Sequence, residues 1–247
     1  MWPYPTLIAH RGGGTTAPEN TLAALAAGLR RCYRAVEFDV MLSRDGIGVV
    51  MHDPDFGRTV PGPGSVAATD AAAIAQLDAG SWFGAPFAGE PVPLFVPFAG
   101  YCKAHGIWMN VEIKPAPGHE EATGRWVADT VRTLFAGESD AARLPLLSSF
   151  SAAALRAARG AAPELPRAIA FEGLPGDWEG QARELGVLSV HVDHRQLTPA
   201  QAEAVKAAGF GLFCYTVNDR ERARALLGWG VDAICTDRID LLPADFS

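Results

Sequence analysis

The sequence predicts an α/β chain that folds as a (β/α)8 TIM barrel, with a small insertion after the second β-α unit region. Short apolar runs typical of strands alternate with amphipathic helical stretches along most of the 247 residues. Eight of these runs can each begin a β-α unit, and a chain of about this length commonly forms one barrel domain, so we expect one domain over residues 1–247. A doubly wound sheet is the alternative, but Gly12-Gly13-Gly14 lacks the GxGxxG spacing of a dinucleotide-binding loop.

The first β-α-β unit is expected within about the first forty residues. The apolar run Leu7-Ile8-Ala9-His10 is closed by Arg11 and three glycines, and we expect a first strand whose end carries His10 and Arg11 into a loop. Pro18-Glu19-Asn20-Thr21 is a helix start, and the helix is expected to end at about residue 31. The run 36–40 then reads as a second strand, parallel to the first because such crossovers are right-handed. Residues 47–51 form an extra apolar strand that ends in His52-Asp53.

Residues 54–93 interrupt this alternation. They are rich in Pro, Gly and Ala, and one helix is expected near residues 69–77. A segment of this length without regular structure is usually functional or a small subdomain. We interpret it as an insertion that could form a lid.

From Leu94 the alternation resumes and continues to the end of the chain. The expected helices cover residues 95–104, 120–136, 151–159, 177–185, 199–208 and 219–227. The expected strands cover residues 108–113, 146–150, 167–171, 187–192, 211–217 and 232–236.

Bulk composition argues against several classes of protein. The formal charge of −7 disfavours nucleic acid or an anionic membrane as the main partner. There is no apolar run of about 18 residues, and the first residues lack the basic and apolar regions of a signal peptide. The four cysteines are widely spaced without a CxxC pair, as expected for reduced thiols. We therefore expect a cytoplasmic protein without stable membrane association, and its oligomeric state stays open.

Two acidic residues on the second strand point to a site. In Val36-Glu37-Phe38-Asp39-Val40 apolar and acidic residues alternate, so Glu37 and Asp39 share a face and lie about 7 Å apart along the strand. Two neighbouring carboxylates repel each other, and such a pair is usually tolerated when a cation or a catalytic proton lies between them. On this stretch alone, an edge strand with a solvated acidic face is the alternative.

In a (β/α)8 barrel the chemistry takes place at the carboxyl ends of the strands. The polar residues expected there are His10 and Arg11 after the first strand, Glu37 and Asp39 at the end of the second, His52 and Asp53 after the extra strand, and Glu112 and Lys114 on the third. Because Glu37, Asp39 and Glu112 lie at matching ends of neighbouring strands, we predict that they bind a metal ion. A set of oxygen ligands favours Mg²⁺ or Ca²⁺ over zinc.

His10 and His52 flank this acidic site, and we predict that they act as an acid-base pair. Three carboxylates, a divalent ion, Arg11 and Lys114 leave a local charge of about +1, which suits a phosphodiester anion. The alternatives are structural histidines and cations that only neutralise the carboxylates. Phe150 and Tyr215 are candidate substrate contacts, with packing in the core or at the rim as the alternative.

At this point the motifs resemble those of the glycerophosphodiester phosphodiesterase family. The matching segments are Ala9-His10-Arg11-Gly12, Pro18-Glu19-Asn20-Thr21, Glu37-Phe38-Asp39, His52-Asp53, Asp78-Ala79-Gly80-Ser81-Trp82, Glu112-Ile113-Lys114, Tyr215-Thr216-Val217-Asn218, Trp229-Gly230-Val231-Asp232 and Cys235-Thr236-Asp237. They cover the whole chain in order. One departure is Leu94-Phe95-Val96, where many members carry acidic residues that are not metal ligands.

The resemblance implies hydrolysis of glycerophosphodiesters, such as glycerophosphocholine or glycerophosphoethanolamine, to sn-glycerol 3-phosphate and an alcohol. It implies a divalent ion on Glu37, Asp39 and Glu112, acid-base catalysis by His10 and His52, and phosphate binding by Arg11 and Lys114. It leaves open the choice of Mg²⁺ or Ca²⁺, the head group, which histidine is the acid, and whether water or the neighbouring glycerol hydroxyl attacks.

Two other functions are compatible with the same residues. A lysophospholipase D or another phospholipase-type phosphodiesterase would need an apolar rim for acyl chains. The insertion offers Trp82, Phe83 and Phe87 for it, without a basic helix that would bind a membrane. A non-catalytic phosphoglycerol-binding protein would lack a metal ligand or a histidine, and none of these residues is missing.

Overall fold

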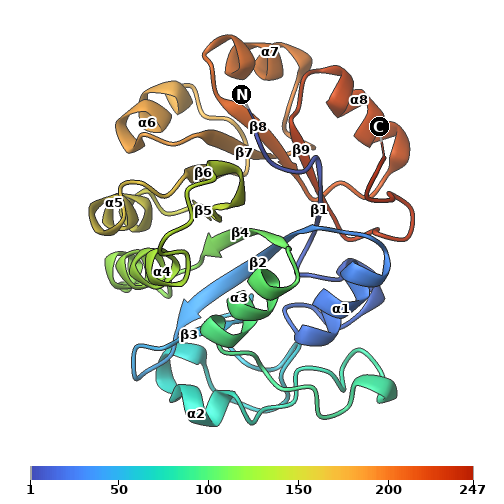
Figure 1. Cartoon of the computed structure of the whole chain (residues 1–247), viewed down its shortest axis with the longest axis vertical. Coiled ribbons are helices and arrows are strands. Elements are labelled where there is room, and N and C mark those ends of the chain that lie inside the picture. Colours follow the sequence, from blue (N-terminus) through green and yellow to red (C-terminus); the bar gives the residue numbers. More distant parts are fainter. Residues whose placement is uncertain (1, 247) are drawn as a thin grey trace.

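In the computed structural model, which describes residues 2–246, eight parallel strands form a closed barrel (Figure 1). The barrel strands are β1 (Leu7–Ala9), β2 (Ala35–Leu42), β4 (Trp108–Ile113), β5 (Leu146–Ser149), β6 (Arg167–Phe171), β7 (Ser189–Asp193), β8 (Gly211–Tyr215) and β9 (Ala233–Thr236). The ring closes because β1 pairs in parallel with both β2 and β9. The predicted (β/α)8 fold is confirmed.

Helices follow the barrel strands and surround them (Figure 1). They are α1 (Leu22–Arg30), α3 (Phe95–Ala104), α4 (Glu120–Leu134), α5 (Ala152–Ala161), α6 (Trp178–Leu185), α7 (Pro199–Ala207) and α8 (Arg220–Gly228). Their starts are encoded locally. Thr21 caps α1 by accepting a hydrogen bond from the Ala24 N–H, and Thr198 and Gln201 form a capping box ahead of α7.

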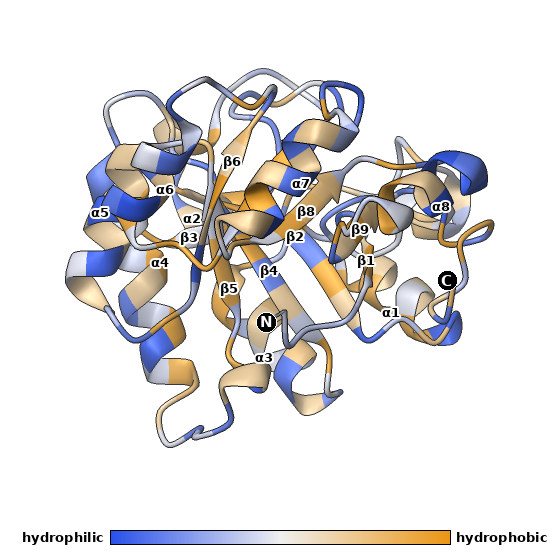
Figure 2. Cartoon of the chain, turned by 90° about the horizontal axis from the view of Figure 1, so that it is seen from above, coloured by the Kyte–Doolittle hydropathy of each residue, from blue (hydrophilic) through white to orange (hydrophobic). Residues whose placement is uncertain are grey.

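The main core lies between the strands and the helices. Strand residues alternate in direction, so one set of side chains points outward against the apolar faces of the helices. Phe38 on β2 is fully buried and packs edge-on against Phe98 of α3, with ring centroids 4.7 Å apart. In Figure 2 hydrophilic segments interrupt the otherwise apolar strands near β2 and β4, where the acidic residues lie.

A second core fills the inside of the barrel at the amino-terminal ends of the strands. Tyr4, which precedes β1, stacks on Trp108 at the start of β4 with ring centroids 4.3 Å apart. Trp2 packs edge-on against the same Trp108 ring at 6.2 Å. This aromatic plug leaves the other end of the barrel for a cavity.

The extra strand β3 (Gly48–Val50) lies outside the ring and pairs antiparallel with the end of β2, Val40 opposite Val50. This partner allows β2 to continue to Leu42. Glu37 and Asp39 therefore lie within β2 and not at its end, which corrects the sequence prediction.

The insertion, residues 54–93, contains only short elements: α2 (Ala71–Ile74) and two 3₁₀ turns, Val66–Ala68 and Ala85–Phe87. The helix expected over residues 69–77 is four residues long, because Leu77 instead accepts a hydrogen bond from the Val92 N–H and Asp78 binds the backbone N–H groups of Gly80 and Ser81.

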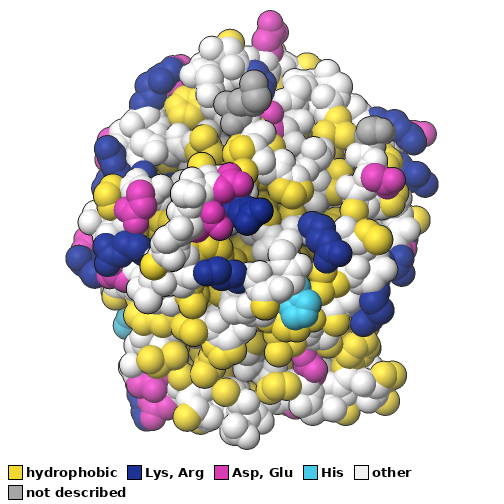
Figure 3. Space-filling view, in the orientation of Figure 1, with side chains coloured by type: hydrophobic (Ala, Val, Ile, Leu, Met, Phe, Trp, Pro, Cys, Tyr) yellow, Lys and Arg dark blue, Asp and Glu magenta, His cyan; other side chains and the backbone are white. Residues whose placement is uncertain are grey.

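The insertion packs a small apolar core of its own against the outer side of β2 and β3. On the face seen in Figure 3, the lower part, over α3 and the insertion, carries mostly hydrophobic and uncharged atoms. Among residues 2–246, no helix combines the length and apolar character needed to cross a bilayer.

Candidate active site

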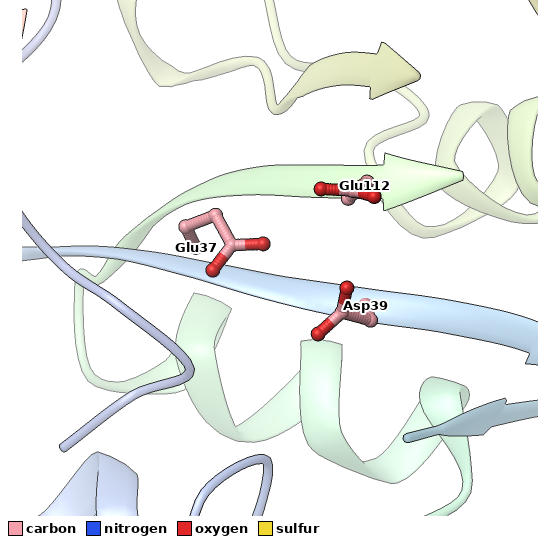
Figure 4. A group of neighbouring side chains, drawn as sticks. All are labelled: Glu37, Asp39 and Glu112. Carbon is pink, nitrogen blue, oxygen red and sulfur yellow. The ribbon is translucent and has the colours of Figure 1, made fainter. Parts of the chain in front are cut away.

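Three acidic side chains converge inside the barrel on neighbouring strands. Glu37 and Asp39 project from β2 and Glu112 from β4, and Asp39 is in register with Glu112 (Figure 4). Each offers one carboxylate oxygen such that these oxygens all lie within 4.8 Å of one another. Glu37 and Asp39 are buried. The structure thus brings together the three residues that were predicted to form a metal site.

The protonation of this cluster reflects burial and repulsion. Burial, followed by the charge of Asp39, raises the pKa of Glu112 to about 8 and that of Glu37 well above its ordinary value. Burial would also raise the pKa of Asp39, but Lys114 and Arg11 outweigh it and lower that pKa to about 2. The cluster therefore combines one carboxyl with a lowered pKa and two buried carboxyls with raised pKa values.

These residues fit a hard divalent cation. The donors are oxygens, the ligand atoms that Mg²⁺ and Ca²⁺ prefer, and a dication would offset the burial and the repulsion that raise the pKa values of Glu37 and Glu112. A neighbouring polar atom, the amide oxygen of Asn110, is buried without a hydrogen-bond partner and belongs to a residue that lines the same cavity.

Two cations stand beside the carboxylates. Lys114 Nζ lies 3.3 Å from Asp39 Oδ1, and Arg11 Nε lies 3.7 Å from Asp39 Oδ2. Arg11 adopts a left-handed backbone conformation, φ 49°, and so does Asn20, φ 58°, which donates from Nδ2 to Asp39 Oδ2 at 2.9 Å. Non-glycine residues in this conformation cost free energy and concentrate at functional sites.

His10 is held from behind by Asp237, which follows β9. His10 Nδ1 lies 2.6 Å from Asp237 Oδ1, and Asn218 donates to Asp237 Oδ2. The glycines after His10 make this approach possible: a Cβ on Gly14 would stand 2.0 Å from the Asp237 carbonyl oxygen, and its φ is +53°. The other ring nitrogen of His10, Nε2, faces the acidic cluster and lies 3.8 Å from Glu37 Oε2.

His52 has the same kind of support. Its Nδ1 lies 2.6 Å from Asp53 Oδ1, which leaves Nε2 as the available nitrogen. Burial lowers the pKa of His52, aided by Arg11 and Lys114 and opposed by Asp39, so the ring is neutral at pH 7. Each histidine therefore has one nitrogen bound to a carboxylate and one free for proton transfer.

The three carboxylates, the two cations and the two histidines line one cavity of about 450 Å³, whereas Asp53 and Asp237 support the histidines from outside its lining. The nine residues singled out from the sequence are among its lining: His10, Arg11, Glu37, Asp39, His52, Glu112, Lys114, Phe150 and Tyr215. Phe150 is 48% exposed and meets Tyr215 edge-on, with ring centroids 5.8 Å apart. Both rings stand at the rim of the cavity. The Tyr215 ring is held there because its hydroxyl donates a hydrogen bond to the Phe171 carbonyl.

None of the residues 54–93 lines this cavity, so the structure does not show the lid that the sequence suggested. Trp82, Phe83 and Phe87 form an edge-to-face series among themselves and take no part in the cavity wall. The cause is the small core of the insertion, which holds the segment against β2 and β3.

Several residues that line or support the site are not among the candidate site residues predicted from the sequence, although His191 and Asp193 were expected on one face late in their strand. Asp237 stands directly after β9, where the rule on strand ends could have found it, but a lone carboxylate gave no pattern. Asp193 and Arg195, an ion pair at the end of β7, line the wall opposite the acidic cluster. His191 lies deeper in that wall, buried and stacked on Phe213.

The raised pKa values predict how stability depends on pH. Glu112 holds its proton up to about pH 8 when folded, whereas in the unfolded chain a glutamate loses it near 4.5, so the folded metal-free protein loses stability as pH rises through this window. Metal binding needs the ionised form and should offset that loss. We expect the rise in Tm caused by added Mg²⁺ or Ca²⁺ to be larger at pH 8 than at pH 6, as measured by calorimetry. An equal rise at both pH values would contradict this assignment.

Comparison with known proteins agrees with this architecture. The sequence model of the Glycerophosphoryl diester phosphodiesterase family matches residues 10–241. A glycerophosphodiester phosphodiesterase of Caldanaerobacter subterraneus subsp. tengcongensis is 32% identical over 94% of this chain and 93% of its own. This chain also resembles the structure of an Oleispira antarctica phosphodiesterase in complex with the product sn-glycerol-3-phosphate. The two sequences are 34% identical, and the structures superpose with a TM-score of 0.90 over 98% of this chain and 95% of that one. A glycerophosphodiester phosphodiesterase from Agrobacterium tumefaciens is 28% identical, with a TM-score of 0.82 over 97% of this chain and 99% of its own.

The fold and these likenesses define the class: the protein is a TIM-barrel phosphodiesterase, a hydrolase. More specifically, the chain belongs to the glycerophosphoryl diester phosphodiesterase family.

Proposed function

We propose that this chain, acting as one catalytic domain, hydrolyses small glycerophosphodiesters such as glycerophosphocholine and glycerophosphoethanolamine to sn-glycerol 3-phosphate and the corresponding alcohol. One observation carries the proposal: two carboxylate-supported histidines, two cations and the acidic cluster all open into a single cavity. The product named in the Oleispira structure, from a protein 34% identical to this chain, supports the glycerol phosphate half of the substrate.

In this reaction a phosphorus–oxygen bond to an attacking oxygen forms and the bond to the alcohol breaks. One histidine takes the proton of the attacking oxygen through Nε2, and the other gives a proton to the leaving alkoxide. The attacker is water, or the neighbouring glycerol hydroxyl, in which case water opens a cyclic phosphate in a second step. Asp237 and Asp53 orient the two rings, because each binds Nδ1 and so fixes Nε2 as the reactive nitrogen.

The phosphate would lie between the acidic cluster and the two cations. Arg11 and Lys114 neutralise its charge, and the buried Nε of Arg11, which has no hydrogen-bond partner, supplies a free donor. Glu37, Asp39 and Glu112 would hold the Mg²⁺ or Ca²⁺ ion, which when bound supplies electrostatic stabilisation of phosphoryl or hydroxyl oxygens. Phe150 and Tyr215 would contact the organic part of the substrate from the rim.

The insertion gives no support to the lipid alternative. The aromatic residues that it offers for acyl chains, Trp82, Phe83 and Phe87, stand outside the cavity lining. The binding-only alternative predicts an incomplete site, whereas both histidines and all three carboxylates are in place.

A cytoplasmic location also belongs to this proposal. All four cysteines lie among the described residues and are free thiols, three of them buried, which suits a reducing compartment. Fractionation of the cells that produce the protein, followed by immunoblotting, would test it, and recovery outside the cytoplasm would contradict it.

Substrate choice tests the proposed reaction. We expect phosphorus NMR to show conversion of glycerophosphocholine to glycerol 3-phosphate, with little reaction of detergent-dispersed lysophosphatidylcholine, because the aromatic residues that the insertion offers for an acyl chain lie outside the cavity lining. Activity confined to the lysolipid would support the lipid alternative instead. Transient formation of a cyclic phosphate in the same spectra would identify the glycerol hydroxyl as the attacker.

A further inference from the structure

Arg58, a residue of the insertion, binds two carboxylates that in turn hold residues of the site. Arg58 donates from Nε to Asp53 Oδ2 at 2.5 Å, and Asp53 uses its other oxygen to hold His52. The same guanidinium donates from both terminal nitrogens to Glu19, at 2.7 Å each. Glu19 in turn accepts a hydrogen bond from Arg11.

These bonds form a continuous chain. It runs from Arg11 through Glu19, Arg58 and Asp53 to His52, so a proposed phosphate ligand and a proposed proton-transfer residue share one connecting cation. The Arg58–Glu19 pair is bidentate, and such pairs are directional as well as attractive, so it restricts the orientation of the guanidinium that also binds Asp53.

The backbone around Arg58 is anchored. Thr59 and Val60 are buried, and Val60 belongs to the apolar core of the insertion. Gly57 donates to the Val60 carbonyl at 2.7 Å in a tight turn that carries Arg58. The guanidinium therefore starts from a fixed point although its side chain is 46% exposed.

We propose that Arg58 is a positioning residue, through which the insertion holds Asp53 and thereby fixes the His52 ring for proton transfer. This inference rests on the proposed function, because it acts through His52. It gives the insertion a role as a support of the site, in place of the lid that the sequence suggested.

Arg58 should influence turnover more than substrate binding. Among the described residues, Arg58 and His52 are the side chains that hydrogen-bond to the Asp53 carboxylate. Loss of Arg58 therefore leaves this carboxylate held by His52 and free to turn. Arg11 keeps further contacts when Arg58 is lost, because its backbone N–H donates to Glu37 and its Nε stands beside Asp39. A small misplacement of a catalytic group can cost about 100-fold in rate.

The test compares Arg58→Gln, Arg58→Lys and Arg44→Gln, with glycerophosphocholine as substrate and Mg²⁺ or Ca²⁺ at saturation. Arg44 is the matched control, because it makes a bidentate pair with Asp70 in the same insertion but contacts no site residue. We expect Arg58→Gln to lower kcat by about 10- to 100-fold with a smaller change in KM. Arg58→Lys should recover part of the loss and Arg44→Gln should keep the wild-type kcat.

The decisive arm repeats Arg58→Gln in a His52→Ala background. If Arg58 acts through His52, the second substitution should cause no further loss of kcat. Two results would overturn the role of Arg58 but leave the acid-base pair standing. One is that Arg58→Gln lowers kcat by the same factor in the wild-type and His52→Ala backgrounds, and the other is that Arg58→Gln keeps the wild-type kcat although His52→Ala is impaired. A His52→Ala variant with wild-type kcat would overturn the proposed acid-base pair and this inference together.

Discussion

Replacement of His10 or His52 by alanine is expected to lower kcat by about 10²- to 10⁴-fold, the usual contribution of a positioned acid or base. Each ring has Nδ1 held by a carboxylate, which leaves Nε2 as the nitrogen available for proton transfer. Steady-state kinetics on glycerophosphocholine at saturating metal measures the effect. KM should change less, because the two rings move protons and do not carry the phosphate charge.

The matched control is His105→Ala. His105 is exposed at the end of α3, where it stacks on Tyr101 far from the cavity lining, so this variant should keep the wild-type kcat. If either His10→Ala or His52→Ala kept a near wild-type kcat, the assignment of an acid-base pair would be wrong.

Replacement of Glu112 by glutamine is expected to weaken binding of Mg²⁺ or Ca²⁺ by more than about 100-fold. Loss of a residue that only hydrogen-bonds to a metal ligand already costs about 10- to 100-fold, and Glu112 is a candidate ligand itself. The substitution keeps the shape of the side chain and removes its charge. Titration calorimetry on chelator-stripped protein measures the affinity, and kcat should fall with it.

The stability of this variant separates loss of metal from loss of fold. Burial and the charge of Asp39 disfavour ionisation of Glu112, so the neutral glutamine should leave the metal-free protein at least as stable as wild type at pH 8. Glu121→Gln, an exposed change on α4, serves as the control that leaves metal affinity unaltered. Unchanged metal affinity in Glu112→Gln would remove Glu112 from the metal site.

The barrel could be predicted because its signal is local. Each β-α unit carries its own periodicity, and the carboxyl ends of parallel strands meet at one rim, so His10, Glu112 and Lys114 could be placed together without coordinates. The same reasoning put Glu37 and Asp39 at a strand end. The turn Ser43-Arg44-Asp45-Gly46 and the strand after it could also be predicted, but not that this strand pairs with β2 as a hairpin and so extends it.

The parts that could not be predicted depend on contacts between distant segments. Asp237 reaches His10 across 227 positions, and Arg58 reaches Glu19 across 39. The insertion has no periodicity to indicate which way it folds, so nothing in its sequence separates a lid from a segment packed against β2 and β3. Its role becomes visible only through the hydrogen bonds of Arg58.

The most direct test of the central claim is release of glycerol 3-phosphate from glycerophosphocholine with EDTA present, followed by addition of excess Mg²⁺ or Ca²⁺. We predict that the chelator abolishes release and that one of the two ions restores it, which would also identify the metal held by Glu37, Asp39 and Glu112. Undiminished release in EDTA would contradict a catalytic metal site. No release with either ion would contradict the proposed reaction itself.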